Sequence, residues 1–256
     1  MDWIIRAETP VYATLYDDLA PLYAFERKRM RNYPAIADFV TREVPDNARA
    51  IGVGACGPGF VLERLAERFE VAVGFDLSPG MLTLARERTD APVVVADLRT
   101  MVAPEAFDVF TILGGSIAHL PVVDGEDSLP TVLACVHESL RPGGTVLIDF
   151  MECGALESGS VMTDSFASDR FSVERTVVTT GRPDGWTDLG ATGQYMLAYE
   201  ITDREKTETV RVGTATAIRE YSPGRLLGAV LNAGFVEARL VSPPTHGSGI
   251  VARKGS

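Results

Sequence analysis

The sequence predicts an α/β protein with a doubly wound parallel sheet as its core and an antiparallel β insertion after the fifth strand. Apolar runs such as "VAVGFD" (71–76) and "TVLIDF" (145–150) alternate with segments whose apolar residues recur at helical spacing. Strands that are apolar throughout are typical of a parallel sheet with helices on both faces. Between about residues 166 and 221 the pattern changes to period-2 stretches separated by turns, which indicates an antiparallel meander.

The elements follow one another in a regular order. Residues 11–44 have a helical pattern that ends at "EVPDN", and a short strand, "ARAIGV" (48–53), then enters a glycine-rich loop. A helix over 60–69 leads to the strand 71–76, which completes a β-loop-α-β unit. The next helix begins with Ser78 as the N-cap and Pro79 at the first helical position, where the missing N–H of proline does no harm.

Further strands are expected at "PVVVAD" (92–97) and "FDVFTIL" (107–113), and a helix over about 126–140 before the turn "RPGG" and the strand 145–150. A helix in "SPGRLLGAVLNAGF" and two closing strands finish the chain. We therefore expect an N-terminal helical cap (1–45), the sheet core (46–152), the β insertion or lid (153–221) and a closing helix with hairpin (222–256).

Composition limits the partners. The chain of 256 residues has a formal net charge of −11, so the protein lacks the basic surface that nucleic-acid binding requires. A small-molecule substrate is therefore expected and a nucleic acid is not. There is no signal-peptide pattern and no apolar run long enough to span a membrane, which predicts a cytoplasmic protein without membrane contact. The three cysteines are scattered and form no metal-ligand pair, so no protein-ligated metal is expected.

The loop "AIGVGACGPGF" (50–60) has two interpretations. Counted from Gly52 it is the G-x-G-x-x-G fingerprint of a dinucleotide enzyme, but this would end the strand near Ile51 and place Pro58 inside the helix, where proline costs about 3 kcal/mol. Counted from Gly54, the strand runs to Val53 or Gly54 and the helix begins after the glycines. The second interpretation fits the local physics better, and it suits S-adenosylmethionine (SAM) because the loop need not enclose a pyrophosphate.

Two acidic residues end the neighbouring strands. Asp76 follows a buried strand and could accept hydrogen bonds from both hydroxyls of a ribose. Asp97 ends the next strand, where its side chain or the Leu98 amide could contact an adenine. Asp76 alone would suit a nicotinamide cofactor equally well, and Asp97 favours SAM.

The motifs "GACGPG", "GFDLSPGMLTLAR", "ADLRTM", "FDVFTILGGSIAHL" and "LRPGGTVLIDF", in this order within about 100 residues, resemble those of class I SAM-dependent methyltransferases, whose sheet is Rossmann-like. The flanking segments resemble small-molecule N,N-dimethyltransferases of TDP-linked amino sugars. The resemblance implies SAM as cofactor, S-adenosylhomocysteine (SAH) as product, and an amine nitrogen as the methyl acceptor. The implied cofactor-binding residues are Tyr16, Tyr33, Gly54, Ala55, Gly57, Gly59, Asp76, Leu77, Met81, Asp97, Leu98, Arg99 and Leu113.

The resemblance also suggests the catalytic residues. His119 follows the fourth strand, near the transferred methyl group in this fold, and could accept a proton from a substrate amine. Tyr16 lies in the N-terminal helical region that folds over the cofactor, and it is the second predicted catalytic residue.

Some positions depart from the resemblance. Val53 stands where the family usually has an acid that organises the amino end of the cofactor, "FMEC" replaces an aromatic pair after the fifth strand, and Ser248 replaces an arginine. Two other functions therefore stay open: an NAD(P)-dependent oxidoreductase that uses the first glycine pattern, and a SAM-binding protein without catalysis. The meander could be a lid or the interface of a homodimer.

Overall fold

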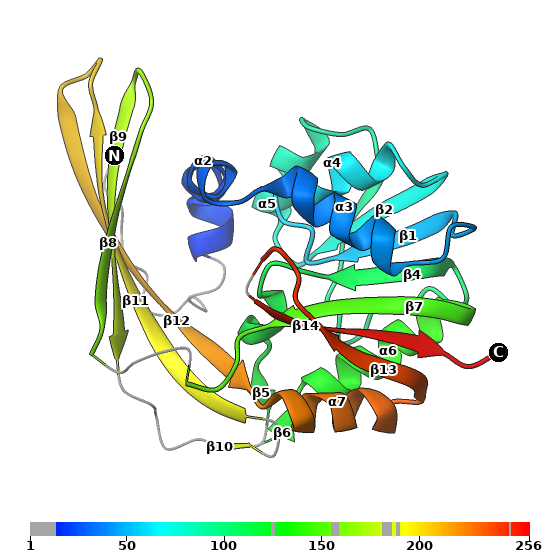
Figure 1. Cartoon of the computed structure of the whole chain (residues 1–256). Helices are drawn as coiled ribbons and strands as arrows, with labels where there is room; N and C mark the ends of the chain where they lie inside the picture. The colour runs from blue at the N-terminus through cyan, green and yellow to red at the C-terminus, as the bar shows by residue number, and fades with distance from the viewer. Residues whose placement is uncertain (1–13, 124–125, 155–158, 181–185, 188–189, 246) are drawn as a thin grey trace.

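The computed structural model of the protein describes residues 14–123, 126–154, 159–180, 186–187, 190–245 and 247–256. Its centre is a seven-stranded sheet (Figure 1). The strands of this sheet are β1 (Ala50–Gly54), β2 (Val71–Asp76), β3 (Val93–Val95), β4 (Phe107–Ile112), β7 (Leu140–Phe150), β13 (Phe235–Val241) and β14 (Ser248–Lys254). They lie side by side in the order β13-β14-β7-β4-β1-β2-β3, which is the predicted doubly wound α/β architecture.

The direction of the strands determines where a ligand can bind. The five strands from β3 to β7 run parallel, whereas β14 runs antiparallel to β7 and β13 antiparallel to β14. The chain order reverses at β1, which has β2 on one side and β4 on the other. Ligands of open parallel sheets bind beyond the carboxyl ends of the strands at this switch point, because the adjacent connections leave on opposite faces.

Helices cover both faces of the sheet because each buried strand sends alternate side chains to opposite sides. On β4, Val109 packs in a cluster with helices α3 (Tyr33–Glu43) and α4 (Phe60–Ala66). The next residue, Phe110, packs in the other cluster with α6 (Leu129–Ser139) and α7 (Pro223–Asn232). None of the described helices is long and apolar enough to cross a membrane.

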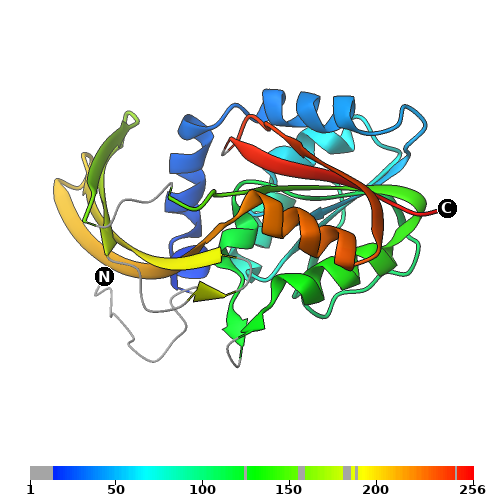
Figure 2. The same cartoon turned by 60° about the horizontal axis from the view of Figure 1, so that its bottom comes forward.

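A second, antiparallel sheet stands beside the core (Figures 1 and 2). Its strands are β8 (Val161–Ala167), β9 (Phe171–Thr180), β10 (Trp186–Thr187), β11 (Gly190–Asp203) and β12 (Glu208–Tyr221). The end of β12 runs back to the core, where the buried Tyr221 hydroxyl donates to the carbonyl oxygen of Ile117 at 2.9 Å. The insertion is therefore anchored to the segment that follows β4.

The N-terminal segment lies between the two sheets (Figure 2). A π-helical turn, η1 (Thr14–Asp18), and helix α2 (Ala20–Met30) precede α3. Leu19 packs among apolar side chains of β9 and β11. Glu26 of α2, fully buried, pairs with buried Arg175 of β9 at 2.7 Å. These contacts join the cap to the antiparallel sheet.

Three boundaries differ from the predictions. The described part of the helical stretch 11–44 is broken between α2 and α3, where the Asn32 side chain accepts from the Ala35 amide and starts a new helix. The helix predicted from about 126 begins at Leu129 because Glu126 and Asp127 form strand β6 (Glu126–Asp127), which pairs with β5 (Val122–Val123). Strand β7 begins at Leu140 rather than after "RPGG".

Candidate functional site

The glycine loop has the geometry expected when the pattern is counted from Gly54, with the helix after the glycines. Strand β1 ends at Gly54 and helix α4 begins at Phe60, so Pro58 lies before the helix. Gly57 and Gly59 have φ angles of 54° and 80°, a region in which a side chain would be strained. A Cβ on Gly57 would meet nothing within 4 Å, so its backbone is open to a ligand. Gly59 instead caps α4 and packs against Ala85, which a Cβ would approach to 3.1 Å.

Asp76, the last residue of β2, organises the edge of the sheet beside this loop. One carboxylate oxygen accepts from the Gly57 amide at 2.8 Å, and the other accepts from the Ser78 amide at 2.9 Å. Burial raises the pKa of the Asp76 carboxyl above its usual range, against the effect of these two amides. Each oxygen keeps a further lone pair, so the carboxylate can also accept from two ligand hydroxyls.

Asp97 lies at the end of the neighbouring strand and is paired within the chain. Its carboxylate accepts from the guanidinium of Arg99, with Arg99 Nε at 3.0 Å from both oxygens. This hydrogen bonding lowers the pKa of Asp97. Arg99 thus keeps the carboxylate ionised and in place, where it can still accept a further hydrogen bond from an amino group.

Two cavities adjoin at this edge of the sheet and share Tyr23, Ala55, Gly57, Gly114 and Ser116. The larger has a volume of about 390 Å³ and the smaller about 70 Å³. The predicted residues that line the larger cavity are Tyr16, Ala55, Gly57, Asp76, Leu77, Met81, Asp97, Leu98, Arg99 and His119. Those that line the smaller cavity are Tyr33, Gly54, Ala55, Gly57 and Leu113. Gly59 lines neither cavity, and the prediction that it contacts the ligand is not supported by this geometry.

The N-terminal cap closes over the larger cavity through one carboxylate. Asp17 of η1 accepts from the Ser78 hydroxyl and from the Gly80 amide, the latter at 2.9 Å. Helix α5 (Pro79–Arg86) begins at this point, with the Ser78 hydroxyl also accepting from the Met81 amide at 3.0 Å. A Cβ on Gly80 would lie 2.8 Å from the Asp17 Cα. The cap can approach α5 this closely only because residue 80 has no side chain.

We expect Gly80→Ala to loosen the cap although alanine favours a helix by up to about 1 kcal/mol. The methyl group would collide with the Asp17 backbone, so amide hydrogen exchange in residues 16–20 should accelerate and the activity of the site should fall at least about tenfold. Gly224 occupies the same place in the second "SPG" sequence, and a Cβ there meets nothing within 4 Å. Gly224→Ala should keep activity and wild-type exchange; equal effects of the two substitutions would contradict the role of Gly80.

The closed cap brings together two residues that lie 103 positions apart. The Tyr16 hydroxyl is 3.2 Å from Nε2 of His119, and the rings meet edge to face with centroids 5.9 Å apart. His119 ends the 3₁₀ turn η2 (Ser116–His119), which Tyr221 of the antiparallel sheet holds through the Ile117 carbonyl. The cap therefore contacts the core at the Tyr16–His119 pair, and the insertion contacts the same turn, η2, on the wall of the larger cavity.

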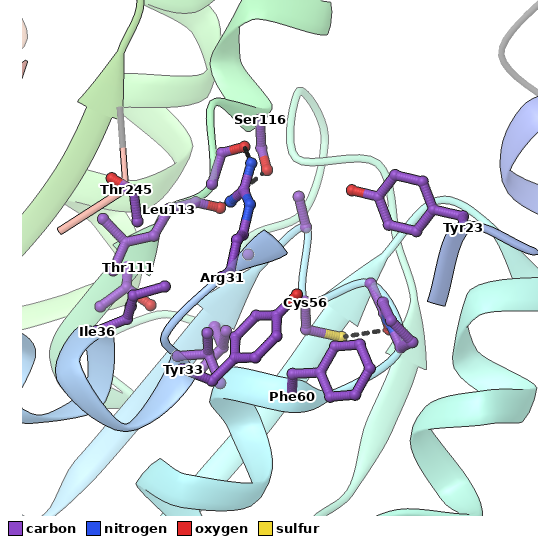
Figure 3. A pocket seen from close by; sticks show the side chains of 17 residues that line it. Tyr23, Arg31, Tyr33, Ile36, Cys56, Phe60, Thr111, Leu113, Ser116 and Thr245 are labelled. Carbon is purple, nitrogen blue, oxygen red and sulfur yellow. Dashed lines mark hydrogen bonds between the residues drawn. The ribbon is translucent and has the colours of Figure 1, made fainter. Parts of the chain in front are cut away.

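A buried acid shapes the loop between β4 and η2. Asp149 of β7 is fully buried and accepts from the amides of Gly114 and Gly115, each at 2.7 Å. The carbonyl of Gly114 in turn accepts from Nη2 of Arg31 at 2.9 Å. This chain of contacts aligns the loop and places Arg31 in the wall of the smaller cavity, as Figure 3 shows.

Sequence reasoning misses several polar or aromatic residues of the two cavities: Tyr23, Arg31, Thr111, Ser116 and Thr245. Thr111 lies in a predicted strand and is the one that a search for polar residues near strand ends could find. Arg31 and Thr245 come from segments far from the motifs. Tyr33, a predicted residue of the smaller cavity, stacks on Phe60 with ring centroids 4.5 Å apart.

Comparison with known proteins shows what the chain is similar to. Residues 54–144 match the family model described as a methyltransferase domain. A curated relative from Streptomyces fradiae, a dTDP-3-amino-3,6-dideoxy-alpha-D-glucopyranose N,N-dimethyltransferase, is 27% identical over 217 residues, which cover 80% of this chain and 83% of the relative.

Solved structures agree with the fold. DesVI of Streptomyces venezuelae superimposes with a TM-score of 0.81 over 94% of this chain and 99% of its own, at 21% identity. The sugar N-methyltransferase KedS8 of Streptoalloteichus sp. gives a TM-score of 0.78 over 100% of this chain and 97% of its own, at 25% identity. The fold is thus shared over essentially the full length of the chain.

Proposed function

We propose that this chain is a class I SAM-dependent methyltransferase that methylates the amine nitrogen of a small, sugar-like acceptor. The observation that carries the acceptor proposal is the Tyr16–His119 pair at the wall of the larger cavity. The curated relative is named for the dimethylation of an amino sugar, and KedS8 is named as a sugar N-methyltransferase.

The residues of the two cavities fit SAM. Asp76 offers lone pairs for the two ribose hydroxyls, and Leu77, Met81 and Leu98 supply the apolar surface that an adenine ring needs. Leu77 is 51% exposed although it is apolar, as expected for a side chain that a ligand covers. When bound, SAM supplies a methyl group that its sulfonium has already made electrophilic.

The chain's own residues would then prepare the acceptor. An amine attacks only through its lone pair, so the protonated form must first lose a proton. His119 would accept this proton at a ring nitrogen, and the Tyr16 hydroxyl would hold the imidazole at the cavity wall through its contact with Nε2. A second methyl transfer would need the same residue to accept the next proton.

Closure of the cavity by the cap would add to the effect of proton transfer. Tyr16 and Tyr23 cover the larger cavity on the cap side, and the Asp17 contacts to Ser78 and Gly80 hold the cap down. Aligning two reactants and excluding water can lower a barrier by about 7–11 kcal/mol. We propose that residues 1–45 form this cap, 46–152 the cofactor core, 153–221 an insertion that completes the acceptor site, and 222–256 the closing part of the core.

The proposal is tested by calorimetric titration with SAM, SAH and NAD, followed by incubation with SAM and dTDP-3-amino-3,6-dideoxyglucose. Micromolar SAH binding and a product that carries one or two extra methyl groups would support it. SAH binding without methylation of any amine, in a panel that includes free amino sugars, would favour a binding protein without catalysis. Binding of NAD alone would show that the first glycine pattern is functional and that the proposal is wrong.

A further inference from the structure

The segment that carries His119 has too little secondary structure of its own to fix this side chain. Its turn, η2, has four residues, and the strands β5 and β6 that follow have two residues each. A 3₁₀ turn has poorer hydrogen-bond geometry than an α-helix, and an isolated two-stranded hairpin is only marginally stable in water. Contacts from other elements must therefore fix the imidazole at the wall of the larger cavity.

Strand β12 provides the first of these contacts, at Ile117. The hydroxyl of the fully buried Tyr221 donates to the Ile117 carbonyl oxygen at 2.9 Å. The same oxygen accepts from the Leu120 amide at 3.2 Å, which closes the turn around His119. The Tyr221 amide donates to the Met151 carbonyl oxygen at 2.7 Å, so the tyrosine is itself fixed beside the end of β7. Burial raises the pKa of Tyr221, so its hydroxyl remains a donor wherever a histidine titrates.

The second contact from β12 is a buried ion pair. Arg219 lies two residues before Tyr221, on the same face of the strand. Its Nη2 is 2.7 Å from Oδ2 of Asp127 in β6, and the two side chains are only 2% and 4% exposed. The other carboxylate oxygen of Asp127 accepts from the Leu129 amide at 2.9 Å, at the start of α6. The Arg219 guanidinium also lies 5.7 Å from the centroid of the Tyr221 ring, so the two contacts form one unit.

These two contacts lie on either side of His119 in the chain. His119 and Pro121, which line the larger cavity, follow Ile117 and precede Asp127. The Pro121 carbonyl oxygen accepts from the Ser128 hydroxyl at 2.5 Å, so the segment is also closed on itself next to the ion pair. A change at the end of β12 therefore reaches the histidine from both directions.

We propose that Tyr221 and Arg219 are positioning residues that set the place of the His119 imidazole for proton transfer. This inference rests on the proposed role of His119 as the base. The cap orients the same ring through Tyr16 at Nε2, whereas β12 fixes the backbone from which the ring extends. The antiparallel insertion thus acts in the chemical step, in addition to any contact that it makes with the acceptor.

The central experiment is a double-mutant cycle between Tyr221→Phe and His119→Gln. Tyr221→Phe removes only the hydroxyl, so kcat should fall about tenfold while the acceptor KM and the SAH affinity stay within about twofold of wild type. In the His119→Gln background the same substitution should cause no further loss, because no base is left to position. An equal loss of kcat in both backgrounds would overturn the proposal.

Variants of the ion pair give a second test. Arg219→Met should lower kcat at least as much as Tyr221→Phe, and Arg219→Lys should recover part of the loss because it keeps the charge that pairs with Asp127. If Arg219→Met does not fold, Arg219→Lys and Tyr221→Phe still decide the matter.

Thr179→Val is the matched control within the insertion. Thr179 is buried, its hydroxyl is 3.0 Å from the Ser160 hydroxyl, and it lines neither cavity. This variant should have a lower Tm and the wild-type kcat. Equal losses of kcat in Thr179→Val and Tyr221→Phe would contradict a specific role of Tyr221.

Histidine ring NMR gives a readout that needs no acceptor. The chain has three histidines, so the His119 signals can be assigned with His119→Gln. In Tyr221→Phe the ring signals of His119 should shift, whereas those of His137 on α6 should not. Unchanged His119 signals would overturn the proposal. If the wild type methylates no amine, the proposed function fails, and the ring signals still decide whether β12 sets the position of His119.

Discussion

Asp76→Ala is expected to weaken SAH binding by about a hundredfold or more. The substitution removes the proposed acceptor of two ribose hydrogen bonds, and hydrogen bonds to a charged group are worth about 1.5–3 kcal/mol each. It also releases the Gly57 and Ser78 amides, which hold the glycine loop and the start of α5. Calorimetric titration with SAH measures the effect directly.

The controls separate ligand binding from folding. Asp203→Ala removes another strand-end acid, which pairs with Arg170. Neither residue lines either cavity, so this variant should bind SAH as the wild type does. Circular dichroism should show both variants folded. If Asp76→Ala binds SAH as tightly as the wild type, Asp76 at the end of β2 does not bind the ribose.

Lowering the pH should produce the same loss reversibly. Burial raises the pKa of Asp76, so its carboxylate becomes protonated above the usual aspartate pKa of about 3.9. SAH affinity should therefore decline as the pH falls toward this raised pKa, because the protonated carboxyl can accept fewer hydrogen bonds. In Asp76→Asn the decline should be absent or strongly reduced; an identical decline would assign it to another group.

The stability of the ligand-free protein should change in the opposite sense. Because the folded-state pKa of Asp76 lies above the unfolded value, its contribution to stability is fully present below the unfolded pKa and is lost as the pH rises through the folded pKa. Without a ligand, the folded protein is therefore less stable when the Asp76 carboxylate is ionised, which is the form proposed to bind the ribose. Thermal unfolding of wild type and Asp76→Asn across this pH range measures the difference.

His119→Gln is the second large effect: kcat should fall about 10²- to 10⁴-fold while SAH affinity stays near the wild-type value. Glutamine keeps a polar group in the cavity wall but cannot take up a proton. Tyr16→Phe should cause a smaller fall, since it removes only the 3.2 Å contact that orients the imidazole. The double variant should lose less kcat than the two single losses combined would predict, because the pair acts as one unit.

His137→Gln is the matched control for this substitution. His137 lies on α6 and packs edge to face on Phe235, with ring centroids 5.0 Å apart, and it lines neither cavity. It should affect stability without lowering kcat. If His119→Gln methylates the acceptor at the wild-type rate across the pH range, the acceptor amine does not use this histidine as a base.

The sequence by itself was sufficient for the fold class, and it placed the residues proposed to bind the nucleoside at one edge of the sheet. The glycine loop, Asp76 and Asp97 all lie within one or two residues of predicted strand ends, and a parallel sheet brings such ends to one edge without any further information. The N-cap at Ser78 is equally local, since the Met81 amide it binds is three residues away. Periodicity and short-range hydrogen bonds determine these features.

Contacts between distant segments were decided only in three dimensions. Tyr16 meets His119 across 103 residues, Arg31 meets Gly114 across 83, and Asp149 holds the loop after β4 across 35 and 34. The contact of Tyr221 with Ile117, across 104 residues, becomes visible only when the surroundings of that turn are known. A residue type and its spacing say what a side chain can do, whereas packing decides which partner satisfies it and which atoms are left for a ligand.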